Sequence, residues 1–197
     1  MTSSNPDPGP RPLRADALRN QQRILTAARA AFAEDGLETP LEDIAKRAGV
    51  APATLYRRFP SRDDLLVAIW EQRFQEELDP ALTAAADHPD PWAAFVDVVA
   101  AAMRMWSVEQ DSLEALRRKG ALMQSSGLRL FETLRRLLER CQQAGRMRTD
   151  LTPDDLPVIL RMASVAVTPG RSETHWRRYL DLLLDALRAP ADRPDPR

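Results

Sequence analysis

The chain has 197 residues, enough for one large hydrophobic core or for a small domain joined to a larger one. Its net charge of -1 argues against a protein that coats nucleic acid or membranes through bulk charge, so any polyanion site must be a local patch. Hydrophobic residues make up 44%, charged residues 29%, and there are only 7 glycines, a balance that favours an all-α fold.

The N-terminal part begins with residues 1–18, which are rich in proline and polar residues and are expected to form a disordered basic arm. A first helix is predicted from about Asn20 to Asp35. Its apolar residues recur at helical spacing between Ile24 and Phe32, and Gly36 follows as a stop signal.

Two short helices are predicted next, over about 40–48 and 52–59. Thr39-Pro40-Leu41-Glu42 has the pattern of a capping box with proline at the first helical position. Gly49 ends the first of these helices, Pro52 can open the second, and Pro60 must end it. Two helices joined by a tight glycine turn form a helix-turn-helix, here about 40–59.

The remaining chain carries further helical patterns separated by proline and glycine. Ser61–Asp64 is a second capping box, and the helix after it is predicted to run to about Leu78, before Pro80. We expect a DNA-binding domain over 19–78, a second domain over 79–189 and a disordered tail over 190–197. The helices predicted in the second domain cover about 92–108, 113–119, 127–144, 153–167 and 173–188.

The helix-turn-helix segment is basic without any acidic residue between Ile44 and Arg62. On a helical wheel, the outer face of 52–59 presents small, hydroxyl and cationic side chains, which can approach base edges and bind bases or phosphates. Arg62 lies in the first turn of the next helix, where the helix dipole disfavours a cation unless an anion such as a DNA phosphate lies nearby. The candidate DNA contacts are Thr39, Lys46, Arg47, Ala53, Thr54, Tyr56, Arg57, Arg58 and Arg62.

Two other interpretations of this basic segment remain. Its charge can be a solvated surface on a helical hairpin that binds nothing. Alternatively, the chain is a helical protein-interaction module that uses its basic patch to bind an acidic protein partner. Acid-free charge, an outward polar face and two capping patterns together favour double-stranded DNA.

The stretch RILTAARAAFAEDGLETPLEDIAKRAGVAPATLYRRFPSRDDLLVAIW, Arg23–Trp70, resembles the N-terminal domain of the TetR (tetracycline repressor) family of bacterial transcription regulators. The resemblance implies a helical homodimer, most often a repressor, that binds a palindromic operator and is released by a small-molecule effector. It assigns DNA contacts to Thr54, Tyr56 and Arg62, and places Ala53, Arg57 and Arg58 on the face that varies with the operator. Ala51 replaces a frequent serine and Pro40 a frequent threonine, so one capping or phosphate contact is either missing or taken over by Thr39.

The last two predicted helices carry apolar stripes that form either an intramolecular core or a dimer interface. The resemblance implies that these helices pair with their copies, and a dimer that reads two half-sites gains specificity. The candidate interface residues are Leu156, Leu160, Ala163, Val167, Trp176, Tyr179, Leu180, Leu183, Leu184 and Leu187.

An effector pocket would need apolar walls with a few polar groups. The middle helices supply apolar stripes of low polarity, which are either core or the wall of a pocket for a hydrophobic or aromatic effector. The candidate ligand-binding residues are Phe95, Val99, Met103, Trp106, Leu116, Met123, Leu128 and Phe131.

No catalytic residue, metal site or cofactor is predicted. His88 and His175 lack partners at metal-ligand spacing, and no phosphate loop or nucleophile motif is present. Cys141 is the single cysteine and is expected to be a buried thiol. The first 20 residues lack the apolar centre of a signal peptide, so we expect a cytoplasmic protein that associates with the nucleoid when it binds DNA.

Overall fold

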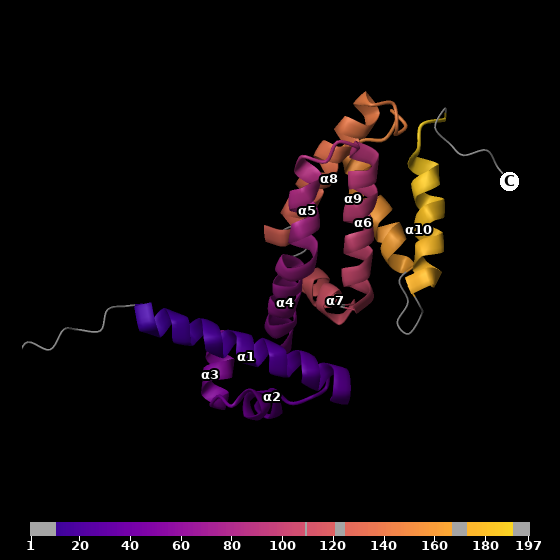
Figure 1. Ribbon diagram of the computed structural model, residues 1–197. Helices are drawn as coiled ribbons and strands as arrows, with labels where there is room; N and C mark the ends of the chain where they lie inside the picture. Colours follow the sequence, from indigo (N-terminus) through magenta and orange to yellow (C-terminus); the bar gives the residue numbers. More distant parts are fainter. Residues whose placement is uncertain (1–10, 109, 121–124, 167–172, 191–197) are drawn as a thin grey trace, which may run out of the picture. The chain divides into compact units, whose positions relative to one another are not determined.

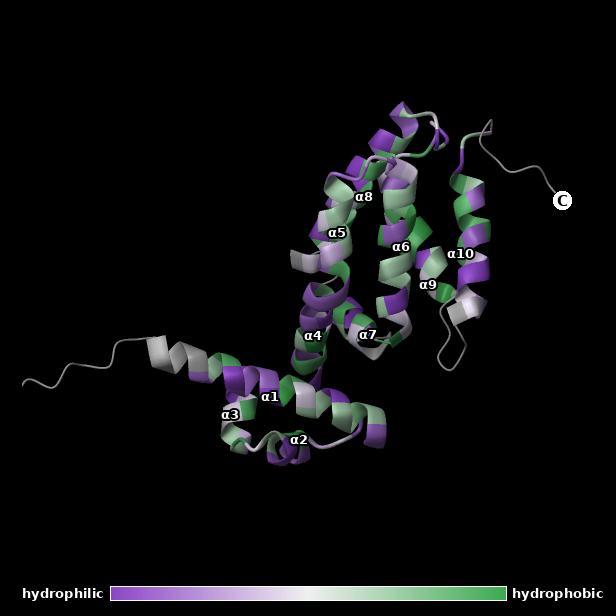
Figure 2. Cartoon of the chain, in the orientation of Figure 1, coloured by the Kyte–Doolittle hydropathy of each residue, from purple (hydrophilic) through white to green (hydrophobic). Residues whose placement is uncertain are grey.

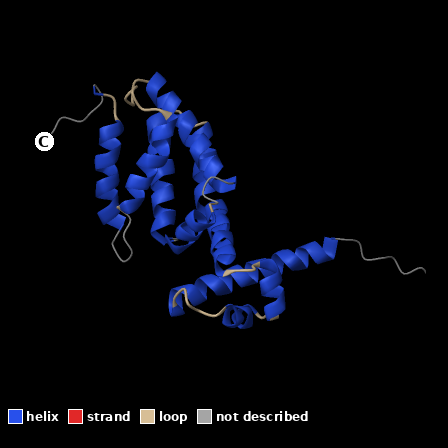
Figure 3. Cartoon of the chain, turned by 180° about the vertical axis from the view of Figure 1, so that it is seen from behind, coloured by secondary structure: helices blue, strands red, loops and turns tan. Residues whose placement is uncertain are grey.

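The computed structural model of the chain describes residues 11–108, 110–120, 125–166 and 173–190. Within these ranges the regular elements are helices joined by loops, with no strand, which confirms the predicted all-α class (Figure 3). The chain divides into two compact units, Met1–Ile69 and Trp70–Arg197.

The first unit contains α1 (Arg11–Asp35), α2 (Leu41–Ala48), α3 (Pro52–Arg58) and the start of α4 (Arg62–Arg73) (Figure 1). A single cluster of apolar side chains holds these helices together. Its buried members are Ile24, Leu25, Ala28, Ala31, Leu41, Ile44, Ala45, Ala48, Leu55, Phe59, Leu65 and Ile69. The helix periodicity in the sequence therefore identified the inward faces of this unit.

Helix α1 begins earlier than predicted. It starts at Arg11, so the expected disorder of residues 1–18 is wrong for residues 11–18, and residues 1–10 lie outside the described residues. Pro12 falls in the first turn, where its missing N–H costs no helical hydrogen bond, and the residues after it are mostly good helix formers.

The helical path also continues through Pro80, which was expected to break it. After α4 the chain makes a π-helical turn (Phe74–Leu78) and passes directly into α5 (Asp79–Ala86). Pro80 lies in the first turn of α5, a position that tolerates proline. The boundary between the units falls after Ile69, whereas the sequence placed it after Leu78. The π-helical turn packs on α5 and α6 of the second unit, which explains the earlier boundary.

The second unit is built around α6 (Pro91–Val108), which contacts α5, α7, α8, α9 and α10. Buried side chains recur from Trp92 to Trp106, whereas Asp97 and Arg104 are exposed. The surrounding elements are α7 (Gln110–Lys119), α8 (Ser125–Gln143), a short 3-10 turn (Pro153–Asp155), α9 (Leu156–Val165) and α10 (Glu173–Leu187). Hydrophobic and hydrophilic residues alternate along α10, as expected for a helix that covers one side of a core (Figure 2).

Polar side chains fix the connection between α5 and α6. The Asp90 carboxylate accepts hydrogen bonds from the backbone N–H groups of Trp92 (2.8 Å) and Ala93 (3.1 Å), which caps α6 and lowers the pKa of Asp90. On α8, the Arg140 guanidinium donates to the carbonyls of Ala85 (3.1 Å) and Ala86 (3.2 Å), the last residues of α5. A cation at this end of a helix is favourable for its dipole.

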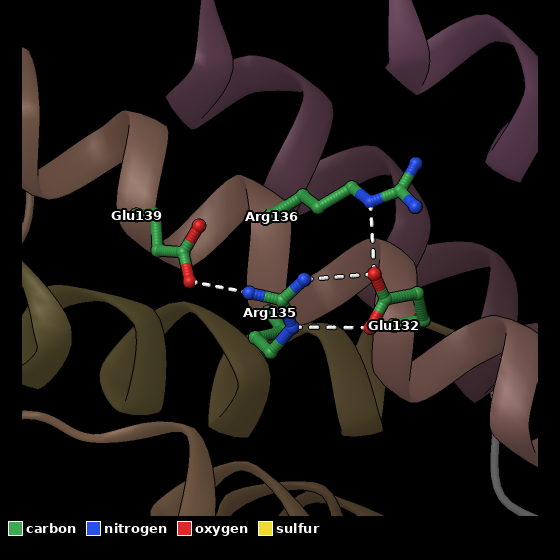
Figure 4. A network of polar contacts seen from close by, with 4 residues as sticks. All are labelled: Glu132, Arg135, Arg136 and Glu139. Carbon is green, nitrogen blue, oxygen red and sulfur yellow. Dashed lines mark hydrogen bonds and ion pairs between the residues drawn. The ribbon is translucent and has the colours of Figure 1, made fainter.

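The outer surface of α8 carries a network of charges (Figure 4). Arg135 binds Glu132 through two hydrogen bonds of 3.0 and 2.8 Å and also reaches Glu139, while Arg136 donates to Glu132 (3.0 Å). The hydrogen bonds from Arg135 lower the pKa of Glu132 to about 2. These pairs are exposed and contribute little to stability, so Arg135 is a suitable control position for the experiments below.

Candidate nucleic-acid interface and ligand cavity

The turn between α2 and α3 depends on Gly49. This residue has the left-handed conformation, with φ of 63°, and its N–H and that of Val50 donate to carbonyls of the last turn of α2. Most side chains disfavour this conformation, so glycine closes the helix and redirects the chain at little cost. The Arg23 guanidinium donates to the Gly49 carbonyl (3.2 Å), which ties the turn to α1.

Helix α3 buries one face and exposes the other. Leu55 and the following Phe59 are buried in the unit, whereas Ala53, Tyr56 and Arg57 are exposed. Thr54 is half-buried and Arg58 is exposed. The structure therefore brings the candidate base-reading residues of the 52–59 segment onto one surface beside a tight turn.

The two arginines at the end of α3 differ in their surroundings. Arg58 donates to the Gln21 side chain on α1 through Nε (3.2 Å) and Nη2 (2.6 Å). Arg57 forms no hydrogen bond or ion pair with any residue that the structure describes, so its guanidinium is available to a ligand. Both line a surface hollow together with Thr54 and with residues of α1 between Asp16 and Ile24. The first turns of α1, expected to be disordered, thus border the candidate interface.

Acidic residues from outside the basic segment neutralise part of its charge. Arg47 pairs with Glu34 (2.8 Å) and with Asp35 at the end of α1, and these contacts raise the pKa of Arg47. Lys46 has no such partner within the described ranges. The segment contains no acidic residue in sequence, but the end of α1, which packs against α2, places acidic side chains beside it.

Arg62 also has an anionic partner within the chain. Its guanidinium lies 3.3 Å from the Glu38 carboxylate and donates to the Thr39 carbonyl (3.3 Å), and Asp63 and Asp64 share the first turn of α4. An anion does lie beside this cation, as the dipole argument requires, but it is a carboxylate of the chain itself, so the position of Arg62 does not by itself indicate a DNA phosphate. The side chain is one-third exposed, so Arg62 still borders the surface.

The predicted capping box at the start of α2 is not formed. Pro40 is the residue at the N-cap position, with no capping side chain. Thr39 is buried, and its hydroxyl donates to the Gly36 carbonyl (2.7 Å), so it closes the loop after α1 instead of facing a ligand. Glu42, the expected second member of the box, accepts a hydrogen bond from the Tyr56 hydroxyl (2.6 Å).

A second candidate site is a cavity of about 370 Å³ within the second unit. Its walls come from α4 and the π-helical turn after it, and from α6, α7, α8 and α9. Of the lining side chains that the structure describes, most are apolar or aromatic and none is acidic. The lining residues are Trp70, Phe74, Trp106, Leu113, Arg117, Gly127, Leu130, Phe131, Pro157, Leu160, Arg161 and Ser164.

The predicted effector residues are distributed between this cavity and the core. Trp106 and Phe131 line the cavity. Phe95, Val99, Met103 and Leu116 are buried and are not among the lining residues, and Leu128 is exposed. Met123 lies outside the described residues. Sequence reasoning missed Trp70 and Phe74, because their helix was assigned to the DNA-binding domain.

The predicted dimer residues of α9 and α10 mostly face the core of their own unit. Buried residues are Leu156, Leu160, Ala163, Trp176, Leu180, Leu184 and Leu187, while Leu183 is half-buried, Tyr179 is exposed and Val167 lies outside the described residues. The exposed large apolar residues on these helices are Val158, Met162, Val165, Tyr179 and Leu182. Helix α9 thus carries apolar residues on a buried face and on an exposed face.

The described residues lack two kinds of feature. They contain no group of three or more His, Cys, Asp or Glu side chains placed to hold a metal ion. None of the helices in the described part of the chain is both long and apolar enough to cross a membrane.

Comparison with known proteins follows this division into two units. Residues 24–69 match the family of bacterial regulatory proteins called the tetR family, and residues 90–189 match the C-terminal domain of SbtR-like transcriptional regulators. The chain is similar to the "Probable acrEF/envCD operon repressor" of Escherichia coli K12, with 28% identity over 75% of this chain and 73% of the relative.

Solved structures extend the similarity over most of the chain. A TetR regulator from Mycobacterium vanbaalenii is 31% identical and matches with a TM-score of 0.57 over 89% of this chain and 99% of its own. One from Streptomyces coelicolor is 29% identical and has a TM-score of 0.59 over 86% of this chain and 99% of its own. The chain therefore belongs to the tetR family of bacterial regulatory proteins and is a DNA-binding transcriptional regulator.

Proposed function

We propose that the protein is a repressor that binds a palindromic operator as a homodimer and is released by a small effector with a large apolar part. The observation that carries this proposal is the outer face of α3, where Ala53, Tyr56 and Arg57 are exposed beside the Gly49 turn. Because its proposed partner is operator DNA, we expect the protein in the cytoplasm, and at the nucleoid when the protein is bound to DNA.

The reading surface has distinct parts with different roles. Ala53, Thr54 and Arg57 lie where a helix that enters the major groove meets base edges, and the Arg57 guanidinium, which has no partner among the described residues, suits a guanine. Arg58 is oriented by Gln21, and Lys46 has no partner in the part of the chain that the structure describes, so both suit backbone phosphates. Phosphate contacts give affinity, and base contacts give sequence preference.

The exposed apolar residues of α9 and α10 support the dimer. Val158, Met162 and Val165 are spaced by four and three residues and therefore share one face of α9, and they are between 58% and 76% exposed. Tyr179 and Leu182 provide a similar face on α10. Soluble proteins seldom leave such a patch uncovered, and a second copy of the same two helices would cover it symmetrically.

The cavity of the second unit supports the effector. Its volume lies within the range of small-molecule sites, roughly 300–1,000 Å³, and its walls are mainly apolar. Trp70, one of its lining residues, belongs to α4, the helix that begins at Arg62 directly after α3. A ligand that displaces α4 would change the placement of α3. By thermodynamic linkage, the ligand then lowers the affinity for DNA by the same factor by which DNA lowers the affinity for the ligand.

The sign of regulation follows the relative from Escherichia coli, whose name describes it as an operon repressor. A protein that covers an operator obstructs the use of that DNA by other proteins, and no residue of this chain is needed beyond those that bind DNA. We therefore assign repression as the default and release as the response to the effector.

Selection from a randomised pool of DNA duplexes at physiological salt tests the proposal. The wild-type protein should enrich an inverted repeat, and the Arg57→Ala/Arg58→Ala variant should not. Enrichment of a single half-site would contradict the dimer, and absence of any enriched sequence would contradict operator reading. Arg135→Gln is the matched control, because it removes a surface arginine of α8 and should enrich the same repeat.

A further inference from the structure

We propose that the effector is a monoanionic amphiphile, an aliphatic or aromatic carboxylate whose apolar body fills the cavity and whose carboxylate binds Arg161 and Arg117. The inference rests on the proposed function in taking this cavity as the effector site. It goes beyond a merely hydrophobic effector because it assigns the charge of the ligand and the residues that select it.

The inner wall of the cavity requires an apolar body. Trp70, Phe74, Trp106 and Leu130 are almost completely buried, and Phe131 is half-buried. Among the lining residues that the structure describes, no side chain is acidic, so none of them would pair with a cationic ligand. An extended hydrocarbon or an aryl group gains the full hydrophobic benefit of leaving water here.

Two arginines among the lining residues supply positive charge. Arg161 on α9 and Arg117 on α7 both line the cavity, and both are exposed, so they border its opening to solvent. The Arg161 guanidinium has no partner among the residues that the structure describes. Arg117 has one long contact of 3.4 Å, with Glu114 of its own helix. A planar guanidinium binds a carboxylate through two parallel hydrogen bonds, which favours this anion.

A third donor is buried without an acceptor. The indole Nε1–H of Trp106 is inaccessible to solvent and makes no hydrogen bond within the described part of the chain, although Trp106 lines the cavity. The other tryptophan of the described lining, Trp70, differs, because its Nε1–H donates to the Ser126 hydroxyl (3.3 Å). Buried donors are usually satisfied, so the Trp106 N–H indicates that the ligand carries an oxygen acceptor.

The described lining therefore combines apolar walls, an unsatisfied buried donor and positive charge, without an acidic side chain. A neutral hydrocarbon would leave the donors unpaired, and a cation would face two arginines without a counter-ion. A carboxylate with an apolar body meets all three requirements.

Titration calorimetry on the full chain tests this with decanoate and decanamide, which share the apolar chain and differ in charge. Decanoate should bind about tenfold more tightly, since charge-assisted hydrogen bonds are about twice as strong as neutral ones. Arg161→Gln should abolish most of this preference while leaving decanamide binding unchanged. Arg135→Gln, a surface arginine of α8 outside the cavity, should leave both affinities unchanged.

The inference is overturned if the two probes bind equally, if decanamide binds better, or if neither binds. It is also overturned if the preference for decanoate survives in the Arg161→Gln/Arg117→Gln double variant. The duplex selection described above uses no probe, so its outcome is independent. An enriched operator without a preference for decanoate refutes only the ligand class, whereas a preference for decanoate without an operator refutes the proposed function and leaves the ligand class standing.

Discussion

The hydroxyl of Tyr56 on α3 donates a hydrogen bond of 2.6 Å to the Glu42 carboxylate on α2. This bond lowers the pKa of Glu42 and raises the pKa of Tyr56, because it stabilises the ionised carboxylate and the protonated phenol together. It also links the two helices of the helix-turn-helix across its exposed side. A DNA phosphate at Tyr56 must compete with Glu42 for the same hydroxyl.

Two substitutions should therefore have opposite effects on DNA binding. Tyr56→Phe removes the donor and should weaken binding to every duplex by about two- to tenfold, the usual worth of one hydrogen bond. Glu42→Gln removes the competing negative charge and should strengthen binding to every duplex, more so at low salt. Fluorescence anisotropy with specific and scrambled duplexes measures both, and equal affinities for wild type and Tyr56→Phe would show that the hydroxyl contacts no phosphate.

Gly49→Ala should destabilise the first unit. An alanine in the left-handed conformation costs about 1–2 kcal/mol, and its Cβ would lie 2.5 Å from Nη2 of Arg23, which must move. Gly36→Ala is the matched control, because Gly36 also has a positive φ of 85° but nothing lies near its added Cβ. Thermal unfolding should show a larger loss for Gly49→Ala, and an equal loss would mean that the Arg23 contact is unimportant.

Met162→Glu should break the proposed dimer. Met162 is 59% exposed at the centre of the apolar face of α9, and a carboxylate opposite its own copy would be desolvated beside a like charge. Sedimentation velocity should show monomers, together with a loss of affinity for the inverted repeat. Leu128→Glu, an exposed leucine of α8, should leave the dimer intact, and a dimer that survives Met162→Glu would place the interface elsewhere.

Cys141 should be unreactive in the folded protein. Burial is the main cause that raises the pKa of its thiol to about 12, so almost no thiolate forms near neutral pH. A thiol reagent at pH 8 should label the protein only after unfolding in urea. Rapid labelling of the native protein would contradict this and would show that Cys141 is accessible to thiol reagents.

The same thiol also makes the free energy of unfolding depend on pH. In the unfolded chain Cys141 loses its proton near its ordinary pKa of 9.0, whereas the folded protein retains it up to about 12. The stability from this group is therefore present below pH 9 and is lost as the pH rises towards 12. Cys141→Ala should unfold with a smaller pH dependence in this range than the wild type.

Local sequence patterns were sufficient for most of the fold. Helix periodicity, Gly49 and Pro52 predicted α2, α3 and the turn between them, because these signals act through backbone geometry over a few residues. The exposed face of α3 followed from the same periodicity. The start of α1 was missed because the polar composition of residues 1–18 outweighed the helix propensity of residues 11–18.

The contacts of the candidate site were harder to predict, because they join residues far apart in sequence. Nothing near Arg62 indicates that Glu38 will lie beside it, and the pairing of Arg58 with Gln21 requires the packing of α1 on the helix-turn-helix. In α9, periodicity identified the buried stripe, but only the structure separates it from the exposed face around Met162.

The most direct test of operator reading is the affinity for the enriched duplex and for a scrambled duplex, measured from low to high salt. Binding to both should weaken as salt rises, because phosphate contacts release counter-ions, but the wild type should keep its preference for the enriched sequence. Arg57→Ala should reduce that preference while leaving scrambled binding nearly unchanged. If salt abolishes the preference, or if Arg57→Ala weakens both duplexes alike, α3 binds DNA through charge alone and the account is wrong.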